Sequence, residues 1–295
     1  MEGPTSHFYF SQRLRLHYVD WGNEDAPPLL LLHGGRDHCR NWDWVAQRLR
    51  ARYHVIAPDL RGHGDSAWAI GGGYDLAAYL YDLAQIIHQK QMAPVTIIAH
   101  SLGAGVALNY CGAFPDNVRK IIAIEGLGPS PSVIAEQATR PVEERLRAWV
   151  TTLRANSGRS PRRYASLDDA IARMAEENPH LTAEQARHLT VFGAQQNEDG
   201  TYSWKFDNNV RWSGGVGGLS HDDQHQLWRA VTAPVLLVRG AESWASDPVV
   251  DGRIKNFQNA RLVNFEDAGH WVHHDQLDSF MREAEAFLAD DPPAS

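Results

Sequence analysis

The sequence is poor in cysteine: Cys39 and Cys111 are the two cysteines among 295 residues. Such a pair forms no disulfide framework, and its surroundings do not resemble a zinc site. A chain of this length also buries enough surface to fold without such cross-links. We therefore expect neither structural disulfides nor a structural metal.

Excess positive charge and long apolar runs are missing as well. Lysine and arginine total 28 against 36 acidic residues, a net charge of −8, which argues against nucleic acid and anionic lipid as partners. No run reaches the roughly 20 apolar residues of a membrane-spanning helix. Met1–Phe10 lacks the features of a signal peptide. We expect a soluble protein of a reducing cytoplasm, either a monomer or a homodimer.

Short apolar, β-branched or leucine-rich runs alternate with amphipathic stretches. The predicted strands are Pro28–His33, Tyr53–Pro58, Val95–His100, Lys120–Glu125, Val235–Gly240 and Ala260–Phe265, preceded by a hairpin over Phe8–Trp21. The predicted helices are Trp42–Arg52, Leu76–Gln91, Gly103–Ala113 and Gln276–Leu288. Strands that are apolar throughout are covered by helices on both faces. The pattern predicts an α/β fold with a mostly parallel sheet, whose sites lie at the carboxyl ends of the strands.

One interval breaks this alternation. The stretch from Glu125 to Val235 is far longer than the about 25 residues that one crossover helix and its loops need. Apolar spacing within it predicts helices over Pro141–Ala155, Leu167–Glu177 and Thr182–Phe192. We expect a core domain of residues 1–126 and 219–295, into which residues 127–218 are inserted as a helical cap.

Ser101 stands between a predicted strand and a predicted helix, in Ala99-His100-Ser101-Leu102-Gly103. A serine on such a tight turn has a strained backbone and an exposed hydroxyl, and its small neighbours avoid collisions with the adjoining strand. This stretch differs from G-x-S-x-G only in having Ala99 in place of the first glycine. The alternative interpretation is an ordinary helix N-cap.

Glycines and a histidine follow two other strands. His33-Gly34-Gly35 lets the backbone approach a ligand, and the amides of Gly35 and Leu102 are candidates to bind an oxyanion, although a simple glycine-rich turn would have the same sequence. His270 follows the last predicted strand and can reach over the sheet edge toward Ser101. His273 and His274 raise the alternative of a metal site. No other ligand type clusters with them, so we predict no metal and place them at the start of the helix.

The stretch Asp59–Ser66 imitates a catalytic cluster, because it holds two carboxylates and a histidine. We interpret it as a structural loop in which Asp59 and Arg61 bind turn amides and each other.

Taken together, these motifs resemble an α/β-hydrolase fold enzyme. His33-Gly34-Gly35, the Asp59–Ser66 loop, the turn at Ser101 and Gly269-His270 occur in the family's chain order and span nearly the whole chain. The resemblance implies a mostly parallel eight-stranded sheet flanked by helices, a nucleophile–acid–histidine triad, and a cap over the site.

The acid of the implied triad has three candidates. The family most often places it after the penultimate strand, where this chain has Ser243 and Trp244, with Glu242 one residue early and Asp247 three residues late. Some members instead use the end of the strand that follows the Ser101 helix, where Glu125 stands, and zearalenone-type lactonases are similar in this respect. We favour Glu125 and keep Asp247 and Glu242 as alternatives.

The serine at the turn suggests the reaction class. Family members that open epoxides or displace halide have aspartate there, so Ser101 implies attack on carbonyl substrates, with esters and lactones favoured and no cofactor needed. Two alternatives stay open: a carbon–carbon bond hydrolase or perhydrolase on the same triad, and a hydrolase-like signal receptor with slow turnover.

The substrate pocket is predicted to be aromatic or apolar. Its candidate lining residues are Gly34, Arg36, Trp149, Trp204, Trp212, Trp244 and Trp271, with Phe192 and Phe206 as further aromatic candidates.

Overall fold

An eight-stranded sheet lies at the centre of the computed structural model, which describes residues 3–211 and 219–289. Its strand order is β1-β2-β4-β3-β5-β6-β9-β10. The strands are β1 Thr5–Ser11, β2 Leu14–Asp20, β3 Pro28–Leu32, β4 His54–Pro58, β5 Val95–His100, β6 Val118–Ile124, β9 Val235–Gly240 and β10 Ala260–Phe265. β2 pairs antiparallel with β1 and with β4, and the remaining pairs are parallel. The predicted sheet and its edge hairpin are thus confirmed.

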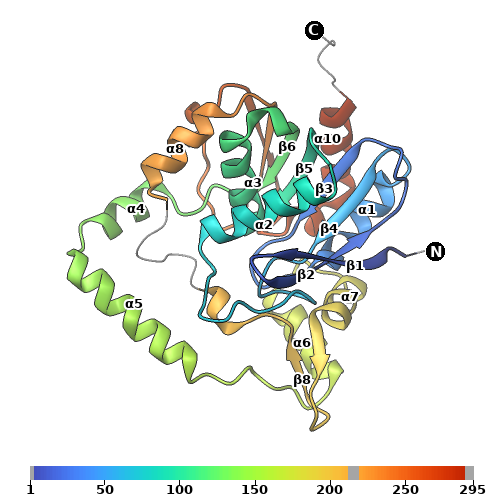
Figure 1. Cartoon of the computed structure of the whole chain (residues 1–295), viewed down its shortest axis with the longest axis vertical. Coiled ribbons are helices and arrows are strands. Elements are labelled where there is room, and N and C mark those ends of the chain that lie inside the picture. The colour runs from blue at the N-terminus through green and yellow to red at the C-terminus, as the bar shows by residue number, and fades with distance from the viewer. Residues whose placement is uncertain (1–2, 212–218, 290–295) are drawn as a thin grey trace.

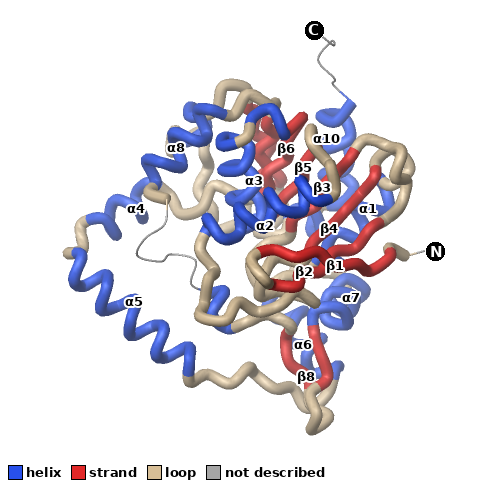
Figure 2. Tube along the Cα trace, viewed as in Figure 1, coloured by secondary structure: helices blue, strands red, loops and turns tan. Residues whose placement is uncertain are grey.

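Helices cover both faces of this sheet (Figures 1 and 2). They are α1 Asp43–Leu49, α2 Leu76–Gln89, α3 Ser101–Ala113, α8 His221–Ala230, α9 Val272–Asp275 and α10 Leu277–Ala289. Alternate residues of one strand face opposite sides: Leu30 and Leu32 pack with α2, α3 and α8, whereas Leu29 and Leu31 pack with α1 and α10. This explains why the strands are apolar throughout.

The segment between β6 and α8 contains α4 Pro131–Ala138, α5 Val142–Ser157, α6 Leu167–Glu177, α7 Ala183–Gly193 and the 3₁₀ helix η3 Asn208–Arg211. The three predicted helices correspond to α5, α6 and α7. The expected helical segment also contains two strands that were not predicted, because β7 Ala194–Gln196 and β8 Tyr202–Trp204 pair as a small antiparallel sheet. Figure 1 shows α5 running along the outside, while α6, α7 and this small sheet lie near one another.

Most predicted boundaries agree with the structure within two or three residues. The first helix is the shortest relative to its prediction: a 3₁₀ turn at Cys39–Trp42 precedes α1, which ends at Leu49, three residues before the predicted end. Among the helices of the described ranges, none has the length and apolar character required to span a lipid bilayer.

Candidate active site

Ser101 occupies a sharp turn between β5 and α3. Its φ of 49° lies in the left-handed region, which is uncommon for a residue with a side chain. A Cβ at Gly103 would lie 2.5 Å from the carbonyl oxygen of His33, so only glycine lets α3 begin this close to the end of β3. The small residue two positions after Ser101 is therefore required by packing.

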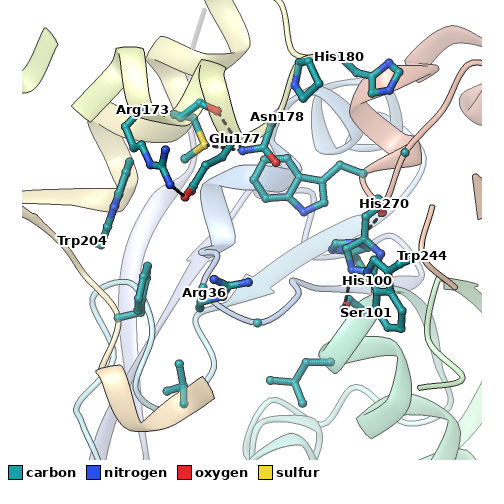
Figure 3. Close-up of a pocket in the computed structure, with 18 of the residues that line it drawn as sticks. Arg36, His100, Ser101, Arg173, Glu177, Asn178, His180, Trp204, Trp244 and His270 are labelled. Atoms are coloured by element: carbon teal, nitrogen blue, oxygen red, sulfur yellow. Dashed lines mark hydrogen bonds and ion pairs between the residues drawn. The ribbon is translucent and has the colours of Figure 1, made fainter. Parts of the chain in front are cut away.

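His270 lies on the loop between β10 and α9, with its ring turned toward Ser101 (Figure 3). The distance from its Nε2 to the Ser101 Oγ is 2.9 Å, which suits a hydrogen bond donated by the hydroxyl. His100 Nε2 donates to the carbonyl oxygen of His270 at 2.9 Å, and the ring centroid of Trp244 lies 5.2 Å from that of His270. A hydrogen bond and an aromatic contact therefore hold the histidine loop over the turn.

Glu125 directly follows β6 and lies behind the His270 ring. Its side chain is fully buried, and its Oε2 lies 3.5 Å from His270 Nδ1. The Gly240 amide donates to Oε1 at 2.8 Å, and the Ser243 hydroxyl donates to Oε2 at 2.7 Å. The distance to Nδ1 exceeds a hydrogen bond, but such contacts in unliganded sites commonly tighten when substrate binds.

The other two candidate acids make different contacts. Asp247 accepts hydrogen bonds from the amides of Val249 and Val250, so it closes a local turn. Glu242 lines the cavity with a half-exposed carboxylate that pairs with His180 at 3.0 Å. Of the three candidates, Glu125 is the one whose carboxylate lies against the His270 ring. Ser243, at the family's usual acid position, instead hydrogen-bonds to this carboxylate from the turn after the neighbouring strand β9.

The two candidate oxyanion donors are the amides of Gly35 and Leu102. Neither amide donates a hydrogen bond within the described ranges 3–211 and 219–289, and both residues line the cavity. Leu102 is the second residue of α3, where helix amides lack internal partners and the helix dipole favours negative charge. Gly34 packs beneath them, because a Cβ there would lie 2.6 Å from His100 Nδ1.

A cavity of about 1070 Å³ opens above Ser101. Its predicted lining residues Arg36, Trp204, Trp244 and Trp271 are present, together with Phe206. The remaining predictions are corrected: Gly34, Trp149 and Phe192 are not part of this lining. Gly34 is buried under the turn, Trp149 lies on the outer helix α5, and Phe192 stacks under Arg40. Trp212 lies outside the described residues.

The lining is mixed rather than apolar. Alongside the aromatic rings it contains the charged or titratable residues Arg36, Arg162, Arg173, Glu177, His180, Glu242 and Asp275. Figure 3 shows Arg173, Glu177, Asn178 and His180 on the wall opposite Ser101. Sequence analysis did not identify these four. They belong to α6 and the turn after it. In the sequence, charged residues on such a helix are equally typical of a solvent-exposed helix face.

Buried histidines support the site from behind. Burial lowers the pKa of His100 and His273 well below the usual value, and lowers that of His274 to about 3, so all three rings are neutral at pH 7. His273 Nε2 donates to Asn41 Oδ1 at 2.6 Å. His273 and His274 lie in α9 at the start of the last helical region, as predicted.

Asp59 anchors a structural loop, but not in the way that the sequence suggested. Its carboxylate accepts hydrogen bonds from His17 and from the amides of Cys39 and Asp65. Arg61 pairs instead with Asp82 on α2 at 2.6 Å, so the predicted Asp59–Arg61 bond is wrong. Within the described chain His17, Cys39 and Asp59 are close enough to share a metal ion, but their short mutual contacts already satisfy the carboxylate.

A family model described as alpha/beta hydrolase fold matches residues 27–277. The chain belongs to this family. It is similar to Esterase Rv0045c of Mycobacterium tuberculosis, with 27% identity over 280 residues that cover 94% of this chain and 87% of the esterase. Lipase LipV of the same organism is 27% identical over 262 residues, covering 87% of this chain and 91% of the lipase.

Solved structures share the fold. The thioesterase domain from the curacin biosynthetic pathway superposes with a TM-score of 0.85 at 22% identity, covering 97% of this chain and 100% of the domain. E-2-(acetamidomethylene)succinate hydrolase superposes with a TM-score of 0.80 at 23% identity, covering 97% and 99%. The chain is therefore an α/β-hydrolase-fold protein whose sequence relatives include proteins named esterase and lipase.

Proposed function

We propose that this protein is a serine hydrolase that cleaves carboxylic esters or lactones through Ser101, His270 and Glu125. The observation that carries the proposal is the 2.9 Å contact between Ser101 Oγ and His270 Nε2, at the floor of a cavity and with a buried carboxylate behind the ring. Nucleophile and base within hydrogen-bond reach, and a third group orienting the base, are the requirements for nucleophilic catalysis.

Acylation begins when His270 Nε2 takes the proton of the Ser101 hydroxyl. The oxygen attacks the substrate carbonyl, and the amides of Gly35 and Leu102 donate to the developing oxyanion; each such donor is worth about 3 kcal/mol of barrier. His270 then gives its proton to the leaving alkoxide oxygen, which departs as an alcohol and leaves an acyl ester on Ser101.

Deacylation repeats these steps with water. His270 takes a proton from a water molecule, the resulting hydroxide attacks the acyl carbonyl, and the proton returns to Ser101 Oγ as the carboxylic acid leaves. Throughout, Glu125 stabilises the imidazolium and keeps the hydrogen on Nδ1, so that Nε2 stays free to accept the serine proton. The segment that carries α6 and β8 forms the opposite wall, and we propose that it acts as a cap over the acyl group.

A serine-directed fluorophosphonate tests the proposal. The intact protein should gain the mass of one phosphonyl group on the peptide that contains Ser101, and Ser101→Ala should lose both the label and the hydrolysis of p-nitrophenyl esters. Ser6→Ala, which removes a hydroxyl that also contacts a histidine, is the matched control and should retain both. Labelling of the Ser101→Ala protein at full yield would contradict the assignment.

A further inference from the structure

The cavity above Ser101 is lined by two guanidinium groups that pair with no residue in the described parts of the chain. Its acidic residues are occupied: Glu177 pairs with Arg173, Glu242 pairs with His180, and Asp275 accepts a hydrogen bond from the Gly269 amide. The guanidinium groups of Arg36 and Arg162, in contrast, form no ion pair or hydrogen bond with any residue in the described ranges. Arg162 lies over the Tyr164 ring, 5.1 Å from its centroid.

Arg36 is held in a conformation that other residues would adopt more easily. Its φ is 62°, in the left-handed region that favours glycine, and two glycines precede it. A long side chain at such a position is uncommon, and non-glycine residues in this region cluster at functional sites. The conformational cost at position 36 is explained if the guanidinium binds a ligand.

The position of Arg36 indicates where such a ligand would lie. It directly follows Gly35, the candidate oxyanion donor, and it is exposed to the cavity. In the view of Figure 3 its side chain lies between Trp204 and Ser101. A group bound by this guanidinium would therefore sit near the carbonyl under attack. The molecule carries a net charge of −8, so a local cation is needed to hold an anion at this point.

We propose that Arg36 binds a carboxylate of the substrate, so that the preferred substrates are esters that carry a second, ionised carboxyl group. The planar guanidinium matches a carboxylate with two parallel hydrogen bonds. Arg162 adds positive charge to the same cavity, and the aromatic walls contact the hydrocarbon between the two groups. This inference rests on the proposed function, because it describes the substrate of the same site.

Two pairs of esters test the proposal. In the first pair the leaving group is constant and the acyl chain differs: p-nitrophenyl hydrogen glutarate against p-nitrophenyl valerate. In the second pair the carboxylate is on the leaving group: 4-acetoxybenzoate against 4-acetoxybenzamide. The measured quantity is the ratio of kcat/KM for the charged ester to that for its neutral partner. The pair of esters with the higher ratio shows whether the acyl chain or the leaving group contacts Arg36.

The variant Arg36→Met removes the charge but keeps a long side chain at the same backbone conformation. A charge-assisted pair is lost, so the ratio should fall about tenfold or more in at least one arm, and Arg36→Lys should recover part of it. Arg119→Met is the matched control: Arg119 is exposed at the start of β6, at the other end of that strand from Glu125, and its loss changes net charge equally. The ratio should persist in that variant.

Two results would overturn the inference. One is a native enzyme that cleaves all four esters through Ser101 with no preference for the carboxylate; the other is a preference that Arg36→Met leaves intact. Both would leave the proposed function standing. If instead no ester is cleaved and Ser101 is not labelled, the proposed function fails. The carboxylate site is then tested separately, by glutarate binding measured through tryptophan fluorescence. Arg36→Met should then weaken glutarate binding about tenfold, and equal affinity would refute the carboxylate site.

Discussion

Within residues 3–211 and 219–289, two serine–histidine–carboxylate relays can be compared, and the tighter one is not at the cavity. In the first, Ser101 Oγ lies 2.9 Å from His270 Nε2, while His270 Nδ1 is 3.5 Å from Glu125. In the second, Ser6 Oγ lies 2.8 Å from His17 Nε2, and His17 Nδ1 lies 2.7 Å from Asp59. Side-chain distances alone would therefore favour Ser6 over Ser101, the serine that we propose as the nucleophile.

The surroundings separate the two relays. Ser6 lies on the regular edge strand β1, and neither it nor His17 lines the cavity above Ser101. Asp59 is fully engaged by backbone amides that shape its loop. Ser101 instead has a strained backbone, two free amides beside it and a cavity in front. Short contacts that use every donor and acceptor, as around Asp59, indicate a structural role. Unpaired amide donors beside a serine with a strained backbone indicate a catalytic role.

The largest expected effect separates the two serines. Ser101→Ala should lower kcat for p-nitrophenyl esters by about 10⁴-fold or more, because the attacking oxygen is gone. Ser6→Ala should change kcat by less than about twofold, since its relay has no place for a substrate. Steady-state kinetics of the two purified variants measure both. A collapse of activity in Ser6→Ala with unchanged stability would break the distinction between the relays.

The two carboxylates should fail in different ways. Glu125→Gln removes the group that stabilises the imidazolium, so kcat should fall by about 10²–10⁴-fold with little change in stability. Asp59→Asn leaves buried partners without a full acceptor and should lower the free energy of unfolding by about 3 kcal/mol. Urea unfolding and ester kinetics on both variants measure this. Near-native turnover in Glu125→Gln, together with collapse in Asp247→Asn or Glu242→Gln, would move the acid elsewhere.

A smaller effect concerns two serine hydroxyls, one bonded to the Glu125 carboxylate and one bonded to the backbone around Asp59. Ser243→Ala removes one hydrogen bond to Glu125, and we expect kcat to fall about tenfold while KM stays nearly constant. Ser243→Thr should restore the loss, which a merely structural role would not require. Ser66→Ala removes the bonds that Ser66 makes to the backbone of His17 and Asp59, and should cost about 1–2 kcal/mol of stability with little effect on kcat.

A further prediction, which concerns stability alone, separates buried from exposed histidines by pH. Burial lowers the pKa of His274 from 6.5 to about 3, so below pH 6.5 the unfolded chain binds a proton that the folded chain does not. The free energy of unfolding should therefore decrease as pH falls from 6.5 toward 3, by about 1.4 kcal/mol per pH unit for each such histidine.

Denaturant titrations between pH 7 and pH 5 measure this slope. His274→Phe should reduce the slope by about 1.4 kcal/mol per pH unit, which corresponds to one bound proton. Replacement of the exposed His88 by Phe should leave the slope unchanged. The same slope in the native protein and in His274→Phe would show that His274 is not the group responsible.

The fold could be predicted from the sequence because its signals are local. Each apolar run is a strand of the parallel sheet, and residues that follow such strands must gather at one edge. That rule predicts Ser101 and His270 at one edge, and the resemblance to the α/β-hydrolase family implies an acid there and offers Glu125. The rule orders strand ends but does not rank acids, so the sequence leaves Glu242 and Asp247 as alternatives, and the 3.5 Å contact with His270 favours Glu125.

Other features depend on contacts that no local pattern contains. β7 and β8 are three residues long, too short for a periodic signal. Arg61 pairs with Asp82 on α2 and not with Asp59, which is closer in the sequence. The Asp59 carboxylate already accepts hydrogen bonds from His17 and from two backbone amides. Trp149 was predicted from residue type alone, and the outer position of α5 takes it away from the cavity.

The adjacency of β6 and β9 has a consequence for where an acid could stand. Residues 125 and 243 are far apart in the chain, yet their side chains meet at Glu125 Oε2, the oxygen that lies 3.5 Å from His270 Nδ1. The ends of these two neighbouring strands therefore open onto the same side of the imidazole. A negative charge delivered from either strand end would reach the same edge of the ring.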